Sequence, residues 1–168
     1  KNIQIARSDL SQFINSDLDD IVFLPNPTIA INEVMRSIIL NKDDEIISSN
    51  HEYGAMDKAW NYICSINKAK HVKAILNHPI KSEESFLNSF ISKFTNRTRA
   101  IFISHITSST GLIFPIKRLI QEARKRNIIS IIDGAHVPGH IELNIKDLNP
   151  DIYTGTCHKW LLCPKGTS

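Results

Sequence analysis

The sequence predicts an α/β fold, a three-layer α/β/α domain built around a mainly parallel sheet. Short β-branched runs alternate with longer amphipathic stretches, which is the order expected of βαβ units. Residues 100–103 and 128–132 carry apolar side chains on both faces, as in central parallel strands covered by helices on each side. The length of 168 residues, 42% of them apolar and 22% charged, is ordinary for one compact domain.

Runs rich in β-branched and other apolar residues mark six expected strands. In chain order they lie at residues 21–24, 45–49, 72–76, 100–105, 128–132 and 151–154. The two runs that are apolar on both faces are expected in the middle of the sheet.

Amphipathic patterns between these runs predict the helices. They lie at about residues 28–40, 54–69, 82–94, 115–126 and 144–148. Pro115 suits the first turn of its helix, where a missing N–H costs nothing. The basic residues 124–126 suit the carboxyl end of the same helix, because cations are favoured at that end of the helix dipole.

The composition excludes several classes of protein. Twenty basic and seventeen acidic residues give a net charge of +3 without a block of like charge, so nucleic-acid binding is not indicated. The three cysteines form no CxxC pair, which argues against a disulfide framework or a structural zinc site and favours the cytoplasm. No apolar run approaches the roughly 18–20 residues that span a bilayer, and no export signal is recognisable.

Polar groups follow five of the expected strands, at the edge where parallel α/β sheets bind ligands. They are Asn26, Thr28 and residues 50–53, 105–108, 133–136 and 156–159. Because the carboxyl ends of parallel strands share one edge, we expect these groups to meet there.

Asp133 comes directly after a fully apolar strand, where an unpaired carboxylate is costly. Such a carboxylate needs a cationic or hydrogen-bonding partner, and a protonated pyridine nitrogen is one. The alternative is an aspartate that only caps the turn before Gly134.

Lys159 follows the last expected strand, between His158 and Trp160. Burial and neighbouring positive charge lower the pKa of a lysine, and the neutral amine is the form that attacks an aldehyde. The alternative is a surface lysine whose stem covers an apolar patch.

Two further groups could contact a flat, phosphorylated ligand. Thr28 and the start of its helix could bind an anion, with Thr156 and His158 completing the site, although Thr28 is equally well explained as an N-cap. His51 or Tyr53 could stack on a ring, or could instead pack within its own domain.

Several segments occur in the order that they have in a known family. Residues 105–111, 133–139, 153–160 and 164–166 resemble the class V aminotransferases, which use pyridoxal 5′-phosphate (PLP). Asn26-x-Thr28 and residues 51–55 are similar to the isopenicillin N epimerase-like branch. The resemblance covers essentially the whole chain.

The resemblance implies the large domain of fold type I, as a single PLP-binding domain over residues 1–168. We expect it to be incomplete at both ends, truncated after the lysine, and without the small C-terminal domain of the family. Lys159 would hold PLP as a Schiff base and Asp133 would pair with its pyridine nitrogen. His136, joined by Ser108, would lie near the phenolic oxygen.

The family also implies the remaining contacts to the cofactor. Thr28, Thr156 and His158 would hold the phosphate. The ring-stacking position falls on His51 by alignment with the cysteine desulfurase branch, and Tyr53 is the alternative.

The expected function is that of a PLP enzyme acting at Cα of an amino acid, of the aminotransferase, epimerase or lyase type. We expect a cytoplasmic homodimer with a small amino-acid substrate and no nucleic-acid or membrane partner. The alternative is a truncated, inactive α/β domain that folds or associates with a partner. A dinucleotide-binding domain is disfavoured because no GxGxxG follows a strand.

Overall fold

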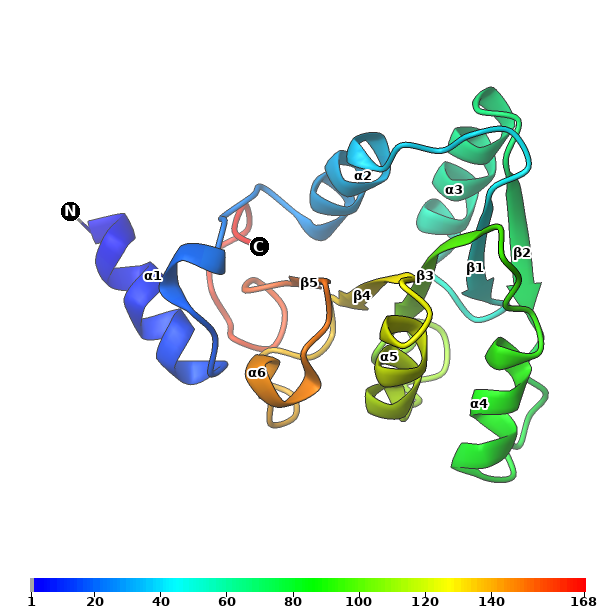
Figure 1. Ribbon diagram of the computed structural model, residues 1–168. Helices are drawn as coiled ribbons and strands as arrows, with labels where there is room; N and C mark the ends of the chain where they lie inside the picture. Colours follow the sequence, from blue (N-terminus) through cyan, green and yellow to red (C-terminus); the bar gives the residue numbers. More distant parts are fainter. Residues whose placement is uncertain (1) are drawn as a thin grey trace.

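Five parallel strands form the sheet in the computed structural model, which describes residues 2–168 (Figure 1). They are β1 (Glu45–Ser49), β2 (Lys70–Ala74), β3 (Thr98–Ser104), β4 (Ile129–Gly134) and β5 (Ile152–Gly155). The strand order is β2-β1-β3-β4-β5, and each adjacent pair is parallel. The runs expected in mid-sheet are β3 at the centre and β4 beside it, which confirms that prediction.

Helices cover both faces of the sheet and give three layers. The helices are α1 (Asn2–Phe13), α2 (Pro27–Ser37), α3 (Gly54–Ile66), α4 (Glu83–Ile91), α5 (Ile116–Arg124) and the short α6 (Ile145–Leu148), with a 3-10 turn at Leu18–Asp20. In Figure 1, α2 and α3 lie above the sheet, and α4 and α5 lie below it. The predicted α/β/α architecture is confirmed.

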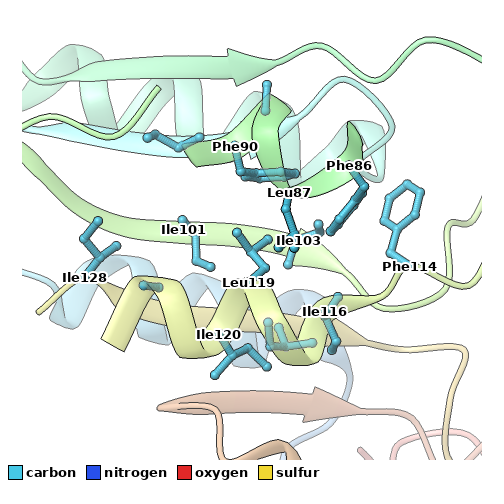
Figure 2. Packing of buried hydrophobic residues seen from close by; sticks show 14 of the residues in the cluster. Phe86, Leu87, Phe90, Ile101, Ile103, Phe114, Ile116, Leu119, Ile120 and Ile128 are labelled. Carbon is cyan, nitrogen blue, oxygen red and sulfur yellow. The ribbon is translucent and has the colours of Figure 1, made fainter. Parts of the chain in front are cut away.

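Alternate residues of the strands point into two separate cores, as the period of two in a strand requires. Ile101 of β3 packs against α4 and α5, whereas its neighbour Phe102 packs against α2 and α3. Figure 2 shows the first of these cores, where Phe86 of α4 and Leu119 of α5 face strand residues such as Ile101.

The register of the parallel strands aligns their carboxyl ends. Ser104 of β3 pairs with Asp133 of β4, and Asp133 pairs with Thr154 of β5. The side chains that follow these three strands therefore leave the sheet at the same edge and at the same height.

One expectation about secondary structure is wrong, and one helix was not expected. Residues 21–24 form no strand; within the described residues they run as extended chain, and Leu24 exchanges two backbone hydrogen bonds of 2.9 Å with Ser168. The apolar run alone cannot make a strand without a neighbouring strand to pair with. Helix α1, at Asn2–Phe13, was not predicted from the sequence.

The ends of two helices also differ from expectation. Asn26 caps α2, because its side-chain oxygen accepts a hydrogen bond of 2.9 Å from the amide of Ile29. Thr28 therefore lies inside the first turn of α2 and is not its N-cap. Pro115 precedes the first residue of α5 instead of occupying its first turn.

None of the helices described within residues 2–168 combines the length and the apolar character that a membrane crossing requires.

Replacement of Phe86 by alanine tests the core between α4 and the sheet. The Phe86 side chain is fully buried, and its ring centroid lies 5.5 Å from that of Phe90 and 5.2 Å from that of Phe114. We expect Phe86→Ala to lower the free energy of unfolding by about 3–5 kcal/mol, measured by denaturant titration. Phe13→Ala is the matched control, since Phe13 is 57% exposed, and it should change stability by less than about 0.5 kcal/mol. Equal losses for the two variants would contradict the packing described here.

Candidate active site

A cavity of about 400 Å³ opens at the carboxyl edge of the sheet, beneath the amino end of α2. Seven of the nine predicted site residues line it, from five separate parts of the chain. They are Thr28, Tyr53, Ser108, Asp133, His136, His158 and Lys159. The topology therefore gathers into one cavity most of the polar groups that the sequence places after strands.

Asp133 is the most buried titratable group on the cavity wall, with only 6% of its surface exposed. Its Oδ1 atom accepts a hydrogen bond of 3.0 Å from the amide of Ala135. Burial raises the pKa of Asp133, and the Ala135 amide and the charge of Lys159 oppose that shift only in part. The carboxylate thus favours a further cationic or hydrogen-bonding partner within the cavity.

Lys159 lies in the turn after β5, half-buried, with its Nζ atom 3.1 Å from Nε2 of His136. Burial lowers the pKa of Lys159, and the nearby charge of Asp133 opposes this shift. Burial, together with the charges of Lys159 and His140, also lowers the pKa of His136. Both groups are therefore biased towards their neutral forms.

The indole of Trp160 fixes which ring nitrogen of His136 carries the proton. Trp160 Nε1 can only donate, and it lies 3.4 Å from Nδ1 of His136, which must accept. In a neutral imidazole the proton is then on Nε2, where it points at Nζ of Lys159. A neutral lysine amine is the acceptor that fits this arrangement.

Gly139 allows the segment of His136 to approach that of Lys159. It has φ of +82°, and a Cβ atom there would lie 2.7 Å from the backbone oxygen of Trp160. Any other residue at this position would push the two segments apart.

Thr28 and His158 both line the cavity. Thr28 is exposed in the first turn of α2, where backbone N–H groups carry the positive end of the helix dipole. His158 is half-buried, and its Nδ1 atom lies 3.2 Å from the backbone oxygen of Thr167. This end of the cavity has the donors that an anion requires.

The cavity also has an aromatic side and an apolar side. Tyr53, the residue immediately before α3, is 49% exposed and lies on the lining. Ile31 and Met56 are buried beside it and belong to the core between α2, α3 and the sheet. A flat ligand with one apolar face and one charged end matches this division.

Two predicted site residues are not part of the cavity lining. The Nε2 atom of His51 lies 2.9 Å from the oxygen of Leu76, and its Nδ1 atom lies 3.3 Å from His78, so the ring is directed away from the cavity. The structure therefore favours Tyr53 over His51 as a ring-stacking residue. Thr156 is fully buried and lines a neighbouring cavity of about 370 Å³ beside α1. Within residues 2–168 its hydroxyl has no hydrogen-bond partner.

Sequence reasoning placed Glu52 at this edge, within residues 50–53, but gave it no role. Its carboxyl group lies beneath the cavity and bonds to Ser104, which is itself on the lining. A charged residue between His51 and Tyr53, in the short segment that follows β1, is the signal that could have identified a role for it.

Comparisons with known proteins identify the family of the chain. The family model for class V aminotransferases matches residues 1–168. The chain is 34% identical to isopenicillin N epimerase of Amycolatopsis lactamdurans, over 96% of the chain and 41% of that protein. It is 30% identical to hercynylcysteine sulfoxide lyase of Schizosaccharomyces pombe, over 96% of the chain and 41% of that protein.

The solved structures show the same fold. The crystal structure of the cysteine desulfurase CsdA from Escherichia coli superposes with a TM-score of 0.87 and 27% identity, covering 98% of this chain and 41% of CsdA. The chain thus spans about two fifths of the length of the proteins that it matches.

The lowered pKa of Lys159 predicts its reactivity. Competitive acetylation at increasing pH, read by mass spectrometry, gives the midpoint of Lys159 deprotonation. This midpoint should lie below 10.5, the pKa of an ordinary lysine. In Asp133→Asn the midpoint should fall further, because the carboxylate charge that favours the ammonium form is removed. A higher midpoint in Asp133→Asn would contradict the electrostatics of the site.

Proposed function

The chain belongs to the class V aminotransferase family, and on that premise we propose that it is the PLP-binding part of an enzyme acting at Cα of an amino acid. The observation that carries the proposal is the pairing of two groups in one cavity. Asp133 is a buried carboxylate in need of a partner, and Lys159 is an amine biased towards its neutral, nucleophilic form.

The residues present fit PLP in charge and shape. The cavity of about 400 Å³ is lined by a carboxylate, by an aromatic side chain and by the first turn of α2, which suits an anion. These match a protonated pyridine, a flat ring and a phosphate, respectively. When bound, PLP supplies an electron sink for the electrons released at Cα of an amino acid.

Each residue has a distinct role in this proposal. Asp133 would accept a hydrogen bond from the pyridine nitrogen and so favour its protonated form. Tyr53 would pack on the ring, and Thr28 would donate to the phosphate, with His158 beside it on the cavity lining. Thr156 is kept as a further phosphate ligand, which its buried hydroxyl without a described partner supports.

Lys159 would hold the cofactor through its amine, and the same amine would serve as the base for the proton at Cα. His136 holds the Lys159 amine through its Nε2 atom and is near enough to share the proton with it. Ser108, which is exposed on the same lining, joins His136 near the phenolic oxygen of the cofactor.

The relatives support chemistry at Cα without selecting one reaction. They are an epimerase, a lyase and a desulfurase by their names. Transamination, epimerisation and cleavage all begin with removal of a group from Cα, which this set of residues provides for. The amino-acid substrate and a homodimeric assembly are proposed from the family alone.

The proposal predicts a covalent complex of the 168-residue chain with PLP. Addition of PLP should produce a new absorption band, and borohydride reduction followed by mass spectrometry should place the adduct on Lys159. Lys159→Ala should lose the band and the adduct. Lys165 is a neighbouring exposed lysine, and Lys165→Ala should keep the band and the adduct. A folded chain with no adduct on Lys159 would instead favour an inactive domain.

The position of Tyr53 predicts which ring contacts the cofactor. Tyr53→Ala should raise the dissociation constant for PLP about tenfold, as expected for loss of an aromatic contact of roughly 1 kcal/mol and of its buried area. His51→Ala should change it less than twofold, because the ring of His51 is turned towards Leu76 and His78. Absorption titration measures both constants, and a larger effect at His51 would reverse the assignment.

A further inference from the structure

The carboxyl group of Glu52 accepts four hydrogen bonds. Glu52 has no role in the cofactor site as proposed so far. Its Oε2 atom accepts from the amide of Ser104 at 2.8 Å and from the hydroxyl of Ser104 at 2.6 Å. Its Oε1 atom accepts from the amide of Ser49 at 3.3 Å and also from the hydroxyl of Ser49. One side chain therefore joins the last residue of β1 to the last residue of β3.

These bonds extend into the turn that carries Tyr53. The Ser49 hydroxyl, which donates to Glu52, accepts a hydrogen bond of 3.0 Å from the amide of His51. Glu52 and Ser49 thus hold both sides of the short segment between β1 and α3. Tyr53 is the next residue along the chain, and it faces the cavity.

Burial of the Glu52 carboxyl group lowers the stability of the fold. The residue is partly exposed, but its carboxyl group is enclosed, and burial raises its pKa to about 7, with the nearby charge of Asp133 adding to the shift. Two buried carboxyl groups close together destabilise a fold unless donors compensate them. The four donors from Ser49 and Ser104 offset part of the free energy lost by burying the carboxyl group. This buried carboxyl group lies beneath the cavity.

We propose that Glu52 is a positioning residue for the cofactor site, which holds Tyr53 over the cavity by tying its turn to the end of β3. The inference rests on the proposed function, since the ring that Tyr53 would contact is that of PLP. Glu52 itself does not line the cavity, so it acts through Tyr53 and not by contact with the ligand.

The chain contains a matched control at the opposite end of the same strand. Glu45, the first residue of β1, also joins β1 to β3, because its Oε2 atom accepts hydrogen bonds from the hydroxyls of Thr95 and Thr98. It lies at the amino edge of the sheet, away from the cavity. Glu45→Ala therefore removes a similar bridge without touching the turn of Tyr53.

A double-mutant cycle between Glu52 and Tyr53 tests the proposal through the dissociation constant for PLP, measured by absorption titration of the full chain. Glu52→Ala should raise this constant about tenfold in the wild-type background, which corresponds to about 1.4 kcal/mol. In a Tyr53→Leu background the same change should raise it less than twofold. Glu45→Ala should leave it unchanged in both backgrounds.

Two further measurements separate positioning from general destabilisation. Glu52→Gln should restore most of the affinity, because its amide can accept from Ser104 and donate to the Ser49 hydroxyl. Amide hydrogen exchange over residues 50–53, measured without PLP, should be faster in Glu52→Ala than in Glu45→Ala. If Glu52→Ala does not fold, Glu52→Asp, which is too short to reach both strands, takes its place in the cycle.

The outcomes distinguish this inference from the proposed function. If wild-type chain forms no adduct with PLP, the proposed function fails and the inference fails with it. If the wild-type chain binds PLP but the effects of Glu52→Ala and Tyr53→Leu are additive, the proposed function stands and Glu52 has no positioning role. Non-additive effects with unchanged binding in Glu45→Ala support the inference.

Discussion

The candidate site depends on one electrostatic constraint, the burial of the Asp133 carboxylate at the end of a central strand. The residue is 6% exposed, and burial raises its pKa despite an amide donor and a nearby ammonium group. An uncompensated charge in this position is costly to the fold. A cation in the cavity lowers that cost, and the protonated ring of PLP is such a cation.

The parallel register explains why the other groups are close enough to act together. Ser104, Asp133 and Thr154 are aligned across β3, β4 and β5, so the segments that follow them begin at one height. Lys159 and His136 then meet at 3.1 Å although they come from different loops. The same alignment places Glu52 beneath the cavity, where it links β1 to β3.

Periodicity and apolar runs were sufficient to predict the five strands of the sheet, the α/β/α layers and the gathering of Asp133, His136 and Lys159 at one edge. They were insufficient at residues 21–24, because an apolar run becomes a strand only where a partner strand lies beside it.

Periodicity and apolar runs also could not orient single side chains. Both His51 and Tyr53 follow β1, and only the contacts of His51 with Leu76 and His78 show that its ring is turned away. Glu52 was expected at this edge within residues 50–53, but its role was missed because its partners lie on two strands that the sequence does not connect.

The most direct test of the account is the ¹⁵N NMR spectrum of the chain loaded with PLP that is ¹⁵N-labelled at the pyridine nitrogen. If Asp133 pairs with that nitrogen, the bound nitrogen should have the chemical shift of a protonated pyridine at neutral pH, and Asp133→Asn should shift it to the unprotonated value. A bound cofactor whose nitrogen is unprotonated in the wild-type chain, or equally protonated in both chains, would contradict the central role given to Asp133.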